Sequence, residues 1–495
     1  MNDSTRSQVH HGLKWVTLSL VFARGTQFLT TVVLARLLLP EMFGLITMAN
    51  AVIIAIGAIR EIGFGQAYIQ RQEADAEEGR LAANTTFFLL LGIHALLFVA
   101  ALLLSPWTAS FFERAQELEA VLQVILLAFL LDGVAGTPGF VLQKNLQFGK
   151  LSLAEIIATF SNALIAIPMA FLGFGAWSLV CGQLGSRLVL CAALLKLSGW
   201  RPRLEFSPRI ARQLFAYGKF LWGFSAVSAV SRVLDRLTLG HLLGAATVGV
   251  YGLAFDLCSM PANQLAILVN RIAFPAFSRK QQDKAALRRG FLKALSHVAV
   301  VTLPLALGLA MVAHDFVLTV YGSQWAAAVP IIGVLACRGM ILAVSSVAGP
   351  VLQAIGKPQV LLYTSVVHSV VLFTLLLLFG RYGLVAVAYA VLVPQILSAL
   401  IAFVLIVRYL NLGVSELLAP LVRSTASALV MYILVRVFQH QLLDGLTSST
   451  LVGLLSSVLV GVVVYLAGTL LWNRALLVEF SETIKEALLA KSRIA

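Results

Sequence analysis

The sequence predicts an all-α membrane protein that crosses the bilayer about fourteen times, and three observations support this prediction. Of the 495 residues, 60% are hydrophobic and only 12% are charged, whereas soluble globular proteins are about half apolar and a quarter charged. The mean hydropathy is +0.93. Apolar runs of about 20 residues, the length that crosses a bilayer core, recur along the whole chain.

Six predicted spans occupy the first part of the chain. Each is an apolar run long enough to cross the bilayer as a helix, and polar or charged residues separate it from the next run. A short turn from Leu38 to Gly44 joins the first two spans and contains Pro40. The six ranges are 13–37, 41–59, 81–104, 118–140, 151–171 and 175–197.

Eight further spans follow by the same criterion. Their ranges are 217–239, 248–270, 291–312, 328–352, 358–380, 383–407, 416–436 and 450–472. The four cysteines lie inside apolar runs without the spacing of metal ligands, so we predict no metal site and no cofactor.

Lys and Arg are distributed very unevenly between the two sets of loops. If the N-terminus is cytoplasmic, 25 of them lie on the cytoplasmic side, and only Arg114 and Arg381 lie in loops on the other. Because cytoplasmic loops of membrane proteins carry the basic excess, we predict that both termini are cytoplasmic. The same distribution accounts for the net charge of +14, which therefore does not indicate a nucleic-acid partner.

A weak internal repeat appears when the chain is shifted by 205 residues. Lys14 then aligns with Lys219, and Gly44 aligns with Gly249, without a gap. The offset equals six spans, so the two copies would share one orientation in the membrane. We predict two pseudo-symmetric six-helix lobes and two extra helices. The corresponding ranges are 1–212, 213–410 and 411–495, the last including a cytoplasmic tail.

The seventh span carries charged residues inside an apolar run. Spacings of three or four residues would place five polar side chains on one face of a helix: Ser225, Ser228, Arg232, Asp235 and Arg236. A charge at the bilayer centre costs about 2.5–3.5 kcal/mol on insertion scales. The stripe therefore indicates either ion pairs that hold helices together or a hydrated cavity.

The repeat places a second polar stripe on the first span, where Gln27 aligns with Arg232 and Thr31 with Arg236. Basic residues outnumber acidic ones inside the spans, and an unpaired buried cation is costly. We therefore predict a hydrated, cationic cavity that binds an anionic substrate. Its predicted lining residues are Arg24, Gln27, Thr31, Arg187, Ser228, Arg232, Arg236, Asn263, Arg271 and Arg338.

Other polar residues deep in the spans are candidates for a coupling-ion site. A carboxylate or histidine in the membrane can carry a proton, and a carboxylate can also hold Na⁺. The alternative for such residues is hydrogen bonding between helices, and both interpretations stay open. The candidates are Asp235, Asp256, Glu155 and His368.

Two motifs give the chain a family resemblance. The turn Leu38–Gly44 and the run Gly63–Gln70, GFGQAYIQ, resemble the polysaccharide-transport, Wzx-type flippases of the multidrug/oligosaccharidyl-lipid/polysaccharide exporter superfamily. The mid-chain sequences YGKFLWG and LDRLTLGHLLGAATVGVYGLA look like the seventh and eighth helices of this family. The resemblance covers essentially the whole chain. Gly63 and Gly65 lack the third glycine and the preceding strand of a nucleotide-binding loop.

The resemblance implies a transporter of the bacterial inner membrane and not an enzyme. Such a protein moves a polyprenyl-pyrophosphate-linked oligosaccharide, a repeat unit of lipopolysaccharide, capsule or exopolysaccharide, from the cytoplasmic to the periplasmic leaflet by alternating access. It would contact membrane lipids, and polysaccharide polymerase and export machinery are further implied partners. H⁺ or Na⁺ coupling is compatible with this function.

Two alternative functions stay open. A multidrug or cation exporter of the related branch should have a cavity rich in acidic residues, whereas arginines predominate in these spans. A membrane enzyme of the same pathway, a glycan polymerase or ligase, should have a large periplasmic loop, whereas the longest predicted one is 105–118. No Ser-His-Asp, metal or paired-carboxylate pattern is evident in the sequence.

Overall fold

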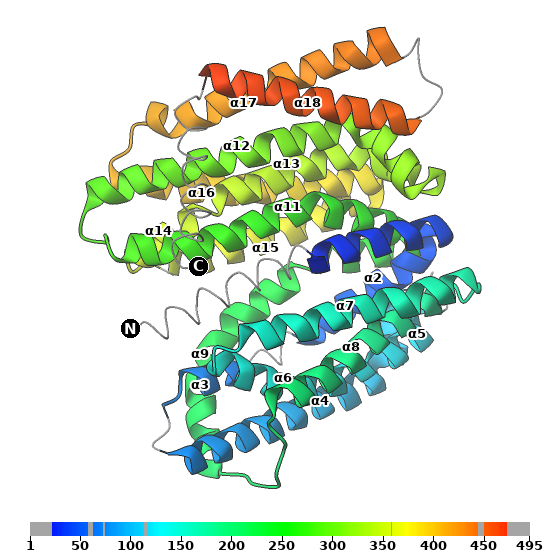
Figure 1. The fold of residues 1–495 in the computed structure, drawn as a ribbon, viewed down its shortest axis with the longest axis vertical. Helices are drawn as coiled ribbons and strands as arrows, with labels where there is room; N and C mark the ends of the chain where they lie inside the picture. Colours follow the sequence, from blue (N-terminus) through cyan, green and yellow to red (C-terminus); the bar gives the residue numbers. More distant parts are fainter. Residues whose placement is uncertain are drawn as a thin grey trace, which may run out of the picture. The chain divides into compact units, whose positions relative to one another are not determined.

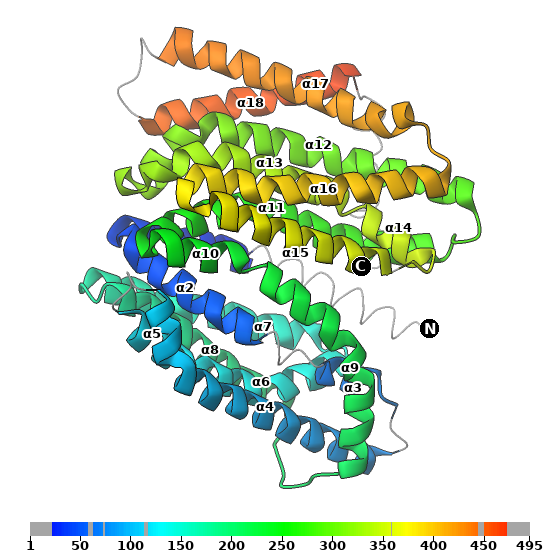
Figure 2. The ribbon, with the colours of Figure 1, turned by 180° about the vertical axis from the view of Figure 1, so that it is seen from behind.

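The computed structural model describes residues 22–57, 63–72, 75–112, 117–357, 359–443 and 450–472. Within these ranges the chain is almost entirely helical and contains no strand (Figure 1, Figure 2). It divides into two compact units, Met1–Val250 (unit 1) and Tyr251–Ala495 (unit 2). The all-α, polytopic fold expected from the composition is confirmed.

Unit 1 is a bundle in which α7 packs against α8, α4 against α6, and α6 against α8. Its first described helix covers residues 22–37. The elements that follow are α2 (Pro40–Gly57), α3 (Phe64–Gln70), α4 (Ala76–Phe111), α5 (Leu118–Ile125), α6 (Leu127–Lys144), α7 (Phe148–Phe171), α8 (Ala176–Ser198), α9 (Pro208–Ser231) and α10 (Leu234–Leu243).

Unit 2 begins within α11 (Ala245–Ser278) and is organised around α12 (Lys284–Phe316), which contacts α13, α17 and α18. Short π and 3₁₀ turns, η1 (Val317–Tyr321), η2 (Ser323–Ala328), η3 (Gly380–Tyr382) and η4 (Gln439–Leu443), interrupt the longer helices. The remaining helices are α13 (Val329–Ser345), α14 (Ala348–Ala354), α15 (Gln359–Phe379), α16 (Leu384–Leu410), α17 (Val414–Phe438) and α18 (Thr450–Trp472).

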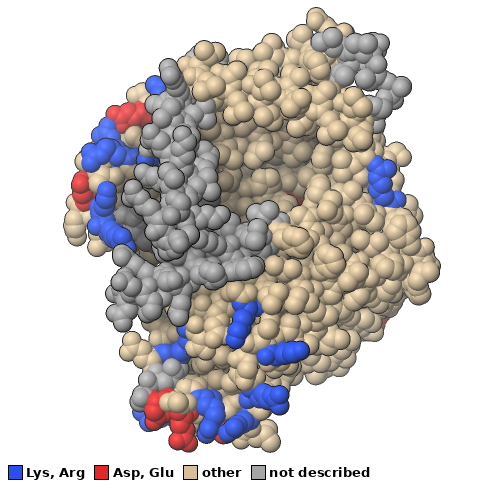
Figure 3. Space-filling view, in the orientation of Figure 1, with Lys and Arg blue, Asp and Glu red and all other residues tan. Residues whose placement is uncertain are grey.

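Twelve helices in the described part of the chain are long and apolar enough to cross a membrane. They correspond to twelve of the fourteen predicted spans. Of the other two, the span at 13–37 begins before the described residues, and the span at 217–239 is not one helix. Most of the visible face in Figure 3 carries neither basic nor acidic side chains, as expected for helices that contact lipid.

The interruption of the seventh predicted span corrects the proposed polar stripe. Helix α9 ends at Ser231, and α10 begins at Leu234 after a turn at Arg232 and Val233. The buried Asp235 carboxylate accepts a hydrogen bond from the Arg236 backbone N–H at 2.8 Å, in the first turn of α10. Because a carboxylate stabilises a helix N-terminus, Asp235 favours a new helix start here. The five residues therefore cannot form a stripe on one continuous helix.

Two glycines that the repeat aligns make reciprocal close contacts at the starts of α2 and α11. A Cβ atom on Gly44 would overlap the carbonyl of Ala245, and one on Gly249 would overlap the carbonyl of Pro40. Pro40 and Ala245 are themselves aligned by the 205-residue offset. The two contacts are thus related by the repeat, which supports its register. The lobe boundary at 212/213 stays a prediction.

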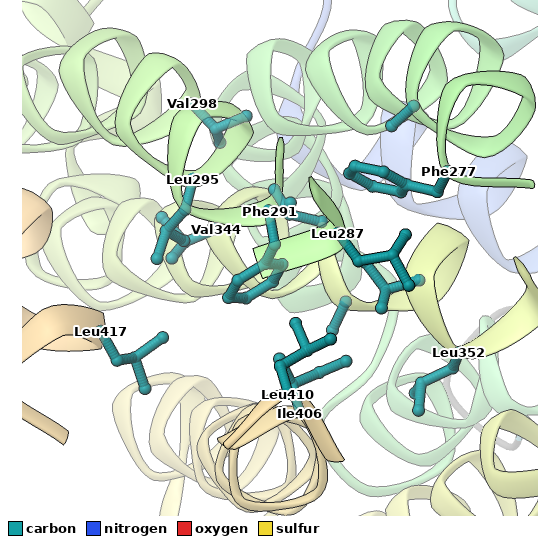
Figure 4. Packing of buried hydrophobic residues seen from close by; sticks show 14 of the residues in the cluster. Phe277, Leu287, Phe291, Leu295, Val298, Val344, Leu352, Ile406, Leu410 and Leu417 are labelled. Carbon is teal, nitrogen blue, oxygen red and sulfur yellow. The ribbon is translucent and has the colours of Figure 1, made fainter. Parts of the chain in front are cut away.

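The core of unit 2 contains a row of apolar side chains on α12. Leu287, Phe291 and Leu295 are four residues apart, and all three are fully buried. Figure 4 shows them among side chains of α13, α14 and α16, including Val344, Leu352, Ile406 and Leu410. The spacing follows the helical period, so one face of α12 supplies this part of the core.

Candidate functional site

Unit 1 contains a polar cavity of about 490 Å³ between the helix at 22–37, α2, α7 and α8, which we call cavity A. Hydroxyl, amide and charged side chains line it beside apolar ones. Because polar groups away from water require hydrogen-bonding partners, such a lining indicates a cavity that holds water or a polar ligand. The polar lining residues are Gln27, Thr30, Thr31, Asn50, Glu155, Thr159, Asn162, Gln183, Ser186 and Arg187.

The helix at 22–37 supplies one wall of cavity A through its predicted polar stripe. Gln27 and Thr31 line the cavity, and Arg24 donates a hydrogen bond to the Gln27 side-chain oxygen at 3.1 Å. Glu155 of α7 also lines the cavity, near enough to Arg24 for a Coulombic attraction. The three-to-four-residue spacing thus puts Gln27 and Thr31 on the face of the helix that lines cavity A, and their role in substrate binding stays a prediction.

An amide pair in the same cavity was not predicted from the sequence. Asn50 of α2 and Gln183 of α8 exchange hydrogen bonds of 3.0 and 3.4 Å. Asn162 of α7 also lines the cavity. Each of these amides interrupts an apolar run in a predicted span, and that signal was present in the sequence. Only the tertiary structure shows that Asn50 and Gln183 pair with each other across two helices.

A second cavity of unit 1, cavity B, has a volume of about 500 Å³. Its wall comes from α4, α6, α8, the start of α7, and the Gly63–Gln66 segment at the start of α3. Arg187 lines both cavities and lies 3.4 Å from the Asp132 carboxylate. The other polar residues of cavity B are Gln66, His94 and Gln143.

Charges are balanced around these two cavities. Arg187 pairs with Asp132, and Arg24 interacts with Glu155. The excess of arginine expected from the spans is therefore not found in the described walls of either cavity. Paired charges cost much less to bury than isolated ones, because each partner replaces part of the lost hydration.

The other predicted site residues line neither cavity A nor cavity B. In unit 1, Arg232 lies in the turn before α10, and Arg236 and Asp235 lie in its first turn. In unit 2, Asp256 and Asn263 are exposed on α11, and Arg338 lies 4.6 Å from the Phe255 ring centroid.

His368 of α15 lies 3.2 Å from the Ser398 hydroxyl, an arrangement that fits hydrogen bonding between helices. The side chains of Ser228 and Arg271 lie outside the described part of the structure. Among the described residues, no group of three or more His, Cys, Asp or Glu side chains could hold a metal ion.

Comparisons with known proteins identify relatives across most of the chain. The chain is 28% identical over 443 residues to the teichuronic acid biosynthesis protein TuaB of Bacillus subtilis, covering 87% of this chain and 89% of the relative. It is 26% identical to the lipopolysaccharide biosynthesis protein WzxC of Escherichia coli, covering 82% of each chain.

The fold is that of a solved membrane transporter. The structure matches the lipid II flippase MurJ in an inward closed conformation with a TM-score of 0.77, covering 93% of this chain and 99% of that one, at 15% identity. The family model described as "Polysaccharide biosynthesis protein" matches residues 33–330, more than half of the chain. The chain therefore belongs to this polysaccharide biosynthesis protein family.

Proposed function

We propose that this protein is a flippase that moves a polyprenyl-pyrophosphate-linked oligosaccharide from the cytoplasmic to the periplasmic leaflet by alternating access. The main support is cavity A, where charged and amide side chains line a space of about 490 Å³ among membrane-spanning helices. Polar residues inside a membrane are costly and mark substrate or ion pathways. Relatives named for the biosynthesis of teichuronic acid and lipopolysaccharide fit this substrate class.

The charge pairs suggest how a pyrophosphate would bind. Arg24 exerts a Coulombic attraction on Glu155. An arriving pyrophosphate would compete with Glu155 for the guanidinium, because phosphate oxygens form strong charge-assisted hydrogen bonds with arginine. A cation, H⁺ or Na⁺, would then balance the displaced carboxylate. Substrate binding at Arg24 would in this way be linked to ion binding at Glu155.

The membrane potential would assist the outward step. An inside-negative potential favours outward movement of anions by about 2.3 kcal/mol per charge per 100 mV. This direction agrees with the proposed orientation, in which both termini are cytoplasmic in a bacterial inner membrane. The protein would bind and release its substrate without chemical change, and polymerase and export machinery would act on the delivered product.

Deletion and complementation provide the test. In cells lacking the protein, the leaflet of the lipid-linked oligosaccharide is assayed with a membrane-impermeant sugar-oxidising probe. We expect accumulation in the cytoplasmic leaflet, cured by the wild type and by the control Arg36→Gln, which removes an exposed arginine at the other end of the same helix. Arg24→Gln, at equal membrane abundance, should reduce flipping at least tenfold.

Two outcomes would contradict the proposal. If the oligosaccharide stalls in the periplasmic leaflet, the protein acts after flipping, as a polymerase or ligase would. If deletion leaves the oligosaccharide pathway intact but raises sensitivity to cationic drugs, the protein is a drug exporter. Full activity of Arg24→Gln would remove Arg24 from the site and leave the flippase function standing.

A further inference from the structure

The glycine-containing segment Gly63–Gln66 forms part of the wall of cavity B. Gly63 has a φ of 79°, a left-handed conformation that favours glycine, and it directly precedes α3. A Cβ atom on Gly65 would overlap the ring of Phe140 on α6. These two glycines let α3 approach α6 closely and bring Phe64 and Gln66 to the cavity. The motif that carries the family resemblance thus shapes a cavity wall.

The lining of cavity B excludes several ligand classes. Its charged residues are Arg187 and Asp132, and they form an ion pair. At cavity B a pyrophosphate would meet Arg187 alone, 3.4 Å from Asp132, whereas at cavity A it would also meet Arg24, which is hydrogen-bonded to the lining residue Gln27. A cationic drug in cavity B would meet one carboxylate that is already paired. A metal ion would need a larger cluster of ligands than the described residues supply.

The same lining suits an uncharged, hydroxyl-rich ligand. The amides of Gln66 and Gln143 each both donate and accept hydrogen bonds, Asp132 accepts them and Arg187 donates them, which matches sugar hydroxyls that do both. The partly exposed ring of Phe140 supplies apolar surface for the C–H face of a sugar. A volume of about 500 Å³ lies in the range of small-molecule sites.

We propose that cavity B binds one uncharged sugar residue of the transported oligosaccharide, an inference that rests on the proposed flippase function. Arg187 connects the two cavities, because its side chain lines both. A substrate whose pyrophosphate lies in cavity A and whose sugar lies in cavity B would contact the same guanidinium. Selectivity for the glycan would therefore come from Gln66 and Gln143, and affinity for the pyrophosphate from cavity A.

The experiment compares two probes bound to the full-length protein in detergent micelles. One probe is the lipid-linked oligosaccharide extracted from cells that lack the protein, and the other is sugar-free polyprenyl pyrophosphate. The variants are Gln66→Leu and Gln143→Leu, which keep the side-chain size but remove the amide. Gln147→Leu is the matched control, because Gln147 is exposed one turn from Gln143 and lines neither cavity.

We expect Gln66→Leu and Gln143→Leu to weaken binding of the sugar-bearing probe about tenfold, since each leaves hydroxyls without a hydrogen-bond partner. Binding of the sugar-free probe and the melting temperature should equal those of Gln147→Leu. If both probes weaken equally, or if neither does, cavity B is not the sugar site. If the wild type binds neither probe, the flippase proposal itself fails. A leucine variant that does not fold is replaced by the methionine variant at the same position, which also removes the amide at similar size and should weaken the sugar-bearing probe selectively.

Discussion

The two units use their buried space differently. Among the cavities formed by the described residues, two in unit 1 have volumes of about 490 and 500 Å³ and charged and amide linings, whereas one around Pro261 in unit 2 has about 30 Å³ and a mostly apolar lining. In unit 2, Leu287, Phe291 and Leu295 are fully buried on one face of α12. We infer that unit 1 is less tightly packed around its cavities because they bind a ligand, and that the tightly packed α12 region makes unit 2 rigid.

The largest effect that tests this comparison should come from the core of unit 2. Phe291→Ala removes a fully buried ring and should lower the free energy of unfolding by about 3–5 kcal/mol. Phe43→Ala is the matched variant in unit 1 and should cost clearly less, because Phe43 already borders cavity A. Thermal unfolding in detergent measures both. Equal losses would show that cavity A is closed and packed in solution.

An effect of intermediate size should come from the ion pair between Arg187, which lines both cavities of unit 1, and Asp132, which lines cavity B. Arg187→Ala removes the guanidinium partner of Asp132 and should reduce transport at least tenfold. If the pair is only structural, the double variant Arg187→Ala/Asp132→Ala should recover both stability and transport, because no buried charge is left unbalanced. If Arg187 contacts substrate, the double variant should recover stability alone. Recovery of transport would therefore contradict its role in both cavities.

The smallest effect should come from two matched helix caps, one in each unit. Asp75 accepts a hydrogen bond from the Glu78 N–H at 2.7 Å to cap α4, and Asp283 accepts one from the Ala286 N–H at 2.9 Å to cap α12. Replacing either with alanine should cost about 1 kcal/mol of stability and leave transport per folded molecule unchanged. A selective transport defect in Asp75→Ala would mean that α4 moves during transport.

Much of the architecture was predictable because the bilayer imposes simple rules on a sequence. Twelve of fourteen predicted spans correspond to helices of sufficient length in the described residues, since an apolar run must form its hydrogen bonds within itself. The offset of 205 aligned Gly44 with Gly249, which then proved to lie in reciprocal contacts. The spacing of Arg24, Gln27 and Thr31 placed the stripe beside cavity A.

The tertiary structure decided what periodicity could not. The spacing of polar residues does not reveal a helix interruption that contains neither Pro nor Gly. The break before Leu234 was therefore not predicted. Composition showed more arginines than acids in the spans, but Asp132, which pairs with Arg187, and Glu155, which is attracted by Arg24, lie on other helices than these arginines. The amide pair of cavity A likewise joins residues 133 positions apart. Hydropathy and helical period determine which segments cross the membrane, whereas only packing between helices determines which polar groups meet inside it.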